Sequence, residues 1–149
     1  MKEELIAPCG MNCNLCSGYL AYLNDIKSKD IRMPYCTGCR PRGKMCAFLK
    51  KRCRLLMEGS VEYCHQCPDY PCHNLKHLDK RYRTLYRMSM IDNLECIRQN
   101  GIDGLLAREE EKWRCPECGE AICCHNGICF NCSVEKLKSK KRLYRWEDG

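Results

Sequence analysis

Hydrophobic positions recur at helical spacing in the middle of the chain. From Pro71 onward, apolar residues step by three and four positions, which places them on one face of an α-helix. Asp92 is then expected to cap a second, shorter helix that ends at Asn100-Gly101, and Asp103 to cap a third that runs to Lys112. The apolar positions of the first helix are Leu75, Leu78, Tyr82, Leu85 and Met88.

Two further segments have weaker helical patterns. Ser17–Lys29 carries Tyr19, Leu20 and Leu23 on one side. Lys44–Met57 has a comparable set of apolar positions and is also expected to be helical. The rest of the chain has no regular period, which is typical of irregular loops.

Composition explains why much of the chain has no regular hydrophobic period, because cysteine stands where other proteins have aliphatic core residues. The chain has 149 residues and 17 cysteines, whereas Leu, Ile, Val and Phe together number 27, or about 18%. Below about 20%, an apolar core is doubtful. This excludes a large barrel, a doubly wound sheet and a membrane protein, whose span needs about 20 apolar residues. Cysteines must therefore help to hold the fold together.

The spacing of the cysteines favours metal over disulfides. Ten of them form five C-x2-C pairs, a spacing that lets two sulfurs face one ion. Their total is odd, and the first residues lack the apolar run of a signal peptide. We therefore expect a reducing, cytoplasmic location.

The clearest metal motif lies near the C-terminus. Two C-x2-C knuckles, Cys115/Cys118 and Cys129/Cys132, are separated by ten residues, the pattern of a four-thiolate zinc ribbon with a short β-hairpin. Gly119, after the second cysteine, suits a position with positive φ. Cys123 and Cys124 in the hairpin are expected to be spare or partly buried thiols rather than ligands, and the neighbouring His125 to lie at the surface.

The N-terminal cysteines predict two more sites. One four-thiolate set is Cys13, Cys16, Cys36 and Cys39. A second is built on Cys64 and Cys67 and is completed from Cys46, Cys53 and Cys72, which leaves one of those three over, together with Cys9. Cofactors are then about three zinc ions per chain. A [4Fe–4S] cluster at part of the N-terminal set is the alternative, because thiolate-only sites suit either metal.

These motifs divide the chain into a Cys-rich metal-binding module (1–72), a helical spacer (73–112), a zinc ribbon (113–132) and a basic tail (133–149). The predicted fold is small, metal-stabilised and mostly α, with irregular Cys-rich loops.

Charge provides the only indication of a partner. The formal net charge is +7, but three Zn(Cys)4 sites would reduce it to about +1, so only local clustering is informative. One cluster lies along one face of the first spacer helix, and another lies in the tail. Tyr86, Tyr144 and Trp146 are available for base stacking. Nucleic acid, RNA or single-stranded, is the expected ligand. The basic residues are Lys76, Lys80, Arg83 and Arg87, then Lys140, Lys141, Arg142 and Arg145.

Two alternatives remain: an electron-transfer protein that uses the N-terminal cysteines, and a protein–protein adaptor that uses the apolar helix face. The sequence has no phosphate-binding loop, no serine elbow and no H-E-x-x-H motif. We therefore expect no catalytic site, no small-molecule substrate and no membrane partner.

Several motifs in order resemble one family. They are Ala7-Pro8-Cys9-Gly10, Cys36-Thr37-Gly38-Cys39, and the run from Val61 to Cys72 with Cys64-His65-Gln66-Cys67-Pro68 at its centre. Over about residues 5–80, this pattern is similar to the Cys-rich family called domain of unknown function 3795. The resemblance implies a small cytoplasmic metal-binding protein with no established activity. The later helices and ribbon resemble an extension of longer members.

Overall fold

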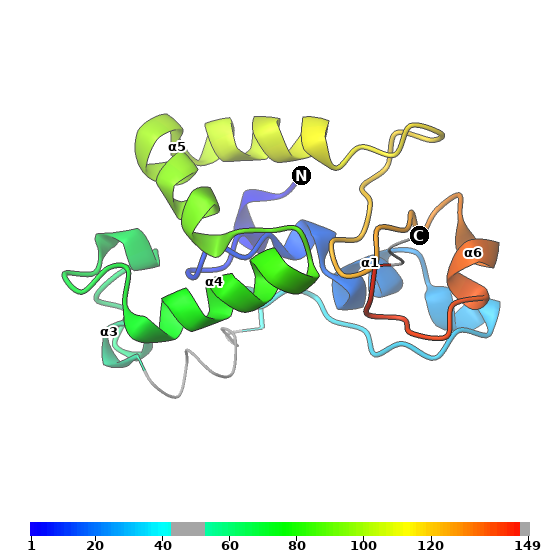
Figure 1. The fold of residues 1–149 in the computed structure, drawn as a ribbon, viewed down its shortest axis with the longest axis horizontal. Coiled ribbons are helices and arrows are strands. Elements are labelled where there is room, and N and C mark those ends of the chain that lie inside the picture. Colours follow the sequence, from blue (N-terminus) through cyan, green and yellow to red (C-terminus); the bar gives the residue numbers. More distant parts are fainter. Residues whose placement is uncertain (43–52, 147–149) are drawn as a thin grey trace.

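The computed structural model describes residues 1–42 and 53–146, and its regular elements are helices (Figure 1). The α-helices are α1 (Ser17–Leu23), α3 (Arg54–Met57), α4 (His73–Leu85), α5 (Met90–Lys112) and α6 (Val134–Lys138). Short 3-10 helices are η1 (Glu3–Leu5), η2 (Cys13–Leu15), η3 (Ile26–Lys29) and η4 (Cys64–Gln66).

The spacer forms α4 and α5, as its periodicity predicts. Leu75 and Leu78 on the apolar face of α4 are buried. The predicted Asp92 cap is wrong: α5 begins three residues earlier, because the Ser89 hydroxyl accepts the Asp92 N–H at 3.0 Å. Gly101, predicted as a stop, is not helical (φ 73°, ψ 176°), so α5 consists of two helices that meet at a kink there, and the second runs to Lys112 as predicted.

The helix predicted over Ser17–Lys29 is confirmed only in its first half. α1 ends at Leu23, and Asp25 at φ 46° reverses the chain before η3. Of the segment predicted as helical over Lys44–Met57, residues 43–52 lie outside the described part, and Arg54–Met57 is helical.

The ribbon has no β-hairpin in the usual sense, which corrects the prediction. Within residues 1–42 and 53–146 there are no strands, and the ribbon has only the isolated bridges Arg114↔Ala121 and Ile122↔Cys129. Two tight turns with positive φ, at Gly119 (83°) and Gly127 (72°), interrupt the segment. Too few consecutive residues remain between them for a ladder.

One core connects the parts of the chain. The N-terminal segment packs against α5, and the Asn93 side chain, in the part of α5 before the kink, donates to the Gly10 carbonyl at 2.8 Å. A Cβ at Gly10 (φ 90°) would lie 2.5 Å from the Met90 carbonyl oxygen, so only glycine permits this approach. Buried thiols, including Cys9, Cys96, Cys123 and Cys124, supply apolar surface that the count of aliphatic residues omits.

The tail also packs on this core. Leu137 of α6 is fully buried. The Trp146 indole donates to the Cys124 carbonyl at 2.8 Å, and the Asn126 side chain donates to the Leu143 carbonyl at 2.8 Å. Residues 133–146 therefore fold back over the loop of the ribbon. No helix among the described residues has both the length and the apolar character needed to cross a bilayer.

Candidate metal centre

The four ribbon cysteines bring their sulfurs together. The Sγ atoms of Cys115, Cys118, Cys129 and Cys132 all lie within 4.8 Å of one another. Across the two knuckles, the Cys115–Cys132 and Cys118–Cys129 pairs are each 3.5 Å apart. A tetrahedral zinc site with Zn–S bonds of about 2.3 Å separates its sulfurs by about 3.8 Å. The arrangement can therefore hold one metal ion with protein ligands alone.

Backbone hydrogen bonds shape the first knuckle. The Gly119 N–H donates to the Cys115 carbonyl at 2.9 Å, and the Cys115 N–H donates to the Glu120 carbonyl at 2.7 Å. A hydrogen bond with the Asn131 side chain is the main cause that lowers the pKa of Cys118, to about 7. The second knuckle thus stabilises a thiolate on the first, the protonation state that metal ligation requires.

The first predicted N-terminal set is adjacent but less compact. Cys13 and Cys39 hydrogen-bond through their side chains, which raises the pKa of Cys13 and lowers that of Cys39 to about 7. Cys16 lies within electrostatic range of Cys36 and Cys39. In the described part of the chain, only the ribbon brings three or more such ligands within 4.8 Å of one another.

The second predicted set surrounds a cavity. Cys53, Cys64, Cys67 and Cys72 all line a space of about 250 Å³. Burial raises the pKa of Cys64 to about 12, and the sulfurs of the other three cysteines add to this rise, so they lie near it. Of the candidates to complete this set, Cys53 and Cys72 are therefore present, and Cys46 lies outside the described residues.

The loop of the ribbon contains three buried groups, of which the sequence did not indicate the histidine. Cys123 and Cys124 are completely buried, and burial raises the pKa of both thiols, that of Cys123 to about 12. The expectation that His125 is a surface residue is wrong, because it is only 8% exposed. Its Nδ1 accepts the Ser17 N–H at 3.1 Å, and its Nε2 lies 3.4 Å from the Tyr82 hydroxyl.

His125 thus joins the N-terminal module, α4 and the ribbon at one point. Because Nδ1 accepts, the ring carries its proton on Nε2 and donates it to the hydroxyl oxygen of Tyr82. Burial lowers the pKa of His125 to about 4, and the positive charge of Arg81 acts in the same direction. The imidazole is therefore neutral at pH 7. The segment around His125 consists of polar and cysteine residues without a hydrophobic period, so its pattern did not indicate that this histidine is buried.

The predicted basic residues are mostly exposed, whereas of the aromatic residues beside them Tyr144 is exposed, Trp146 is half-buried and Tyr86 is buried. Tyr86 is 9% exposed and its ring packs against His125, with centroids 4.7 Å apart, so the expected base stacking by Tyr86 is wrong. The Arg87 guanidinium lies 4.0 Å from the centroid of the Trp146 ring, and this contact places the end of α4 beside the tail. Arg83 pairs with the buried Asp79 at 2.6 Å.

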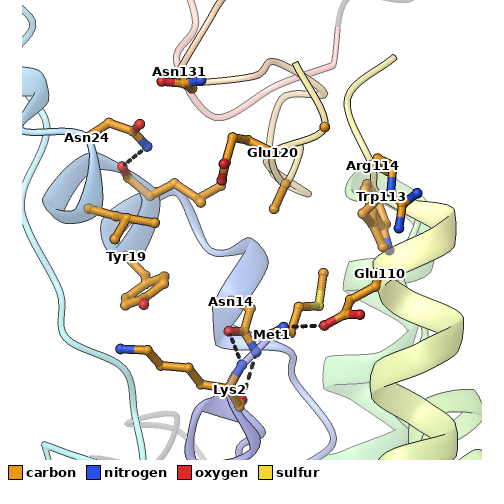
Figure 2. Close-up of a pocket in the computed structure, with 14 residues that line it drawn as sticks. Met1, Lys2, Asn14, Tyr19, Asn24, Glu110, Trp113, Arg114, Glu120 and Asn131 are labelled. Carbon is orange, nitrogen blue, oxygen red and sulfur yellow. Dashed lines mark hydrogen bonds and ion pairs between the residues drawn. The ribbon is translucent and has the colours of Figure 1, made fainter. Parts of the chain in front are cut away.

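A cavity of about 520 Å³ separates the ribbon from the N-terminal module (Figure 2). The N-terminal amine of Met1 forms an ion pair with Glu110 at its edge, which lowers the pKa of that carboxyl. Lys2 exchanges two backbone hydrogen bonds with the Asn14 side chain, at 2.9 and 3.0 Å. The ion pair with Glu110 thus holds the N-terminus against α5 at the edge of this cavity.

Comparison with known proteins gives one result. Residues 5–77 match the family model described as "Protein of unknown function (DUF3795)". No curated protein and no solved structure matches the chain. The match contains both N-terminal cysteine sets and ends before the ribbon, so it confirms the resemblance drawn from the motifs. Residues 5–77 of this chain belong to the DUF3795 family of proteins of unknown function.

Proposed function

We propose that this protein is a non-catalytic zinc protein whose ribbon and tail support a surface that binds single-stranded nucleic acid or RNA. The observation that carries the zinc proposal is the set of four ribbon sulfurs within 4.8 Å of one another. With four protein ligands, such a site is closed, and a closed zinc site is structural. Stability rather than chemistry is then the role of the metal.

The nucleic-acid part rests on exposed charge. Lys76, Lys80 and Arg83 are exposed along α4, and Arg87 is exposed at its end. Because Arg87 contacts Trp146, the stripe on α4 continues into the tail. There, Lys141, Arg142 and Arg145 are exposed and Lys140 is half-buried. A run of cations along one path suits a phosphate backbone, whose contacts give affinity without sequence specificity.

The zinc proposal is tested by metal analysis of the purified chain. Cys118→Ser removes one exposed ligand, and we expect it to lose one zinc per chain. Cobalt(II) substituted for zinc should show the spectrum of a tetrahedral thiolate site in the unmodified chain, and the variant should lose the share of that spectrum that corresponds to one site. An unchanged zinc content in Cys118→Ser would rule out the ribbon as the site.

The nucleic-acid proposal is tested by salt-dependent binding of a single-stranded RNA. Reversing two charges, Lys76→Glu with Lys80→Glu, should weaken binding and make the slope of log K against log salt shallower by about 1.4, since each lost phosphate contact contributes about 0.7. The matched control reverses two exposed charges at the end of α5, Lys112→Glu with Arg114→Glu, and should bind normally. Equal losses in both variants, or no RNA binding by the unmodified chain, would refute the proposal.

A further inference from the structure

The cavity lined by four cysteines differs from the ribbon in how its sulfurs are brought together. Cys53 directly precedes α3, Cys64 begins η4, and Cys72 directly precedes α4. Cys67 follows η4, and its N–H donates to the Cys64 carbonyl at 3.1 Å. Separate segments therefore place the sulfurs around a space of about 250 Å³, whereas the ribbon places its sulfurs on two facing turns.

The spacing of these sulfurs is wider than a single zinc ion requires. In the ribbon, all four sulfurs lie within 4.8 Å of one another, close to the separation of about 3.8 Å expected around zinc. No three of the cavity sulfurs meet that limit, although all four belong to the described residues. A four-iron cluster holds its cysteine ligands farther apart, because irons and bridging sulfides lie between them.

The walls of the cavity are partly apolar, and the four cysteines are buried or half-buried. Leu55, Leu56, Val61 and Leu75 provide an apolar wall, and Cys64 is 8% exposed. The Leu75 N–H donates to the Cys72 sulfur at 3.5 Å, so the first turn of the 13-residue α4 faces the negative charge of that ligand. Hydrogen bonds to the sulfurs and the solvent exposure of the site set the reduction potential of such clusters.

We propose that Cys53, Cys64, Cys67 and Cys72 bind a [4Fe–4S] cluster, at a site separate from the zinc of the ribbon. The protein then holds two kinds of metal centre, each selected by the distance between its sulfurs. This inference goes beyond the proposed function, because the nucleic-acid surface and the ribbon zinc do not require iron.

The test is reconstitution of the full chain with equal amounts of ferrous and ferric iron and with sulfide under strict anoxia, followed by analysis of iron, acid-labile sulfide and zinc. We expect about four irons and four sulfides per chain, with broad visible absorption, while the ribbon keeps its zinc. Iron X-ray absorption should show scattering between iron atoms. A chain that takes up no iron, or iron without sulfide, overturns the proposal.

Variants assign the cluster to this cavity. Cys67→Ser and Cys72→Ser should lose the iron and sulfide but keep the ribbon zinc, which also reports that they are folded. Cys118→Ser should show the reverse, and Cys96→Ser, a matched change at a buried thiol outside the cavity, should keep both metals. Undiminished iron in Cys67→Ser combined with Cys72→Ser would refute the assignment, as would a loss of zinc instead of iron from those two variants. Failure of the ribbon proposal would appear separately, as unchanged zinc in Cys118→Ser.

Discussion

Protonation of His125 should destabilise the folded chain in a measurable pH range. Its folded pKa of about 4 compares with about 6.5 in an unfolded chain. Above pH 6.5, the imidazole is neutral in both states and stability does not depend on it. As the pH falls, the unfolded state binds the proton first, so stability decreases between about pH 6.5 and 4, by up to about 3.4 kcal/mol.

The structure gives the reason for this magnitude. A protonated ring carries an N–H at Nδ1, which faces the Ser17 N–H at 3.1 Å and loses that hydrogen bond. The side chain is also buried, so the charge is poorly hydrated. Between pH 7.5 and 5.5, the free energy of unfolding is expected to fall by about 1.3 kcal/mol. This range is chosen because the thiolate sites are protonated less at pH 5.5 than at pH 4.

The assay is urea unfolding at pH 7.5 and 5.5, followed by circular dichroism, for the unmodified chain and His125→Asn. Asparagine keeps an acceptor for the Ser17 N–H but does not titrate. Both chains have the same cysteines and the same other histidines, so proton-linked metal loss cancels in the comparison. The unmodified chain should lose about 1.3 kcal/mol more than the variant. Equal losses would refute the reasoning, and a ring that titrates near 6.5 by NMR would do so directly.

Three other changes test the packing and the role of metal. Gly127→Ala should destabilise the fold more than Gly59→Ala in thermal unfolding, because both have φ near 70° but only the Cβ at 127 would meet Trp146, at 2.4 Å; similar melting temperatures would contradict this. Asp79→Asn should cost about 1–3 kcal/mol in urea, since its buried carboxylate accepts the Ser89 hydroxyl at 2.7 Å; a cost below about 0.5 kcal/mol would be too small for a buried acceptor. Full chelation should unfold the chain, because metal binding supplies folding free energy; a native circular dichroism spectrum afterwards would show that the apolar core is sufficient.

The helices show where local pattern was enough and where it was not. The apolar period from Leu75 onward predicted α4 because one face of the helix is buried at Leu75 and Leu78 and half-buried at Tyr82 and Leu85. The Asp92 cap failed because Ser89, three positions earlier, offers the same kind of side-chain acceptor, and packing of the preceding Met88 and Met90 favours the earlier start. Propensity alone does not distinguish two capping residues one turn apart.

The expectation that Tyr86 and Trp146 are free to stack on bases failed for a different reason. Tyr86 and Trp146 are polar-tipped aromatic residues next to cations, a pattern that also fits base stacking. In the fold, Tyr86 packs on His125 and Trp146 lies under Arg87, because the tail returns over the loop of the ribbon. These contacts join segments that are distant in sequence, so a local pattern cannot predict them.

The sequence by itself determined the elements whose cause is local: the α4 helix, the positive φ of Gly119 and the ribbon, where two knuckles ten residues apart bring their sulfurs together. Tertiary structure alone decided which N-terminal sulfurs share a cavity, how far apart they stand and that His125 is buried. Ligand spacing along the chain limits which atoms can meet. The distance between sulfurs on different segments, however, depends on how those segments pack, and that distance distinguishes a site for one ion from a site for a cluster.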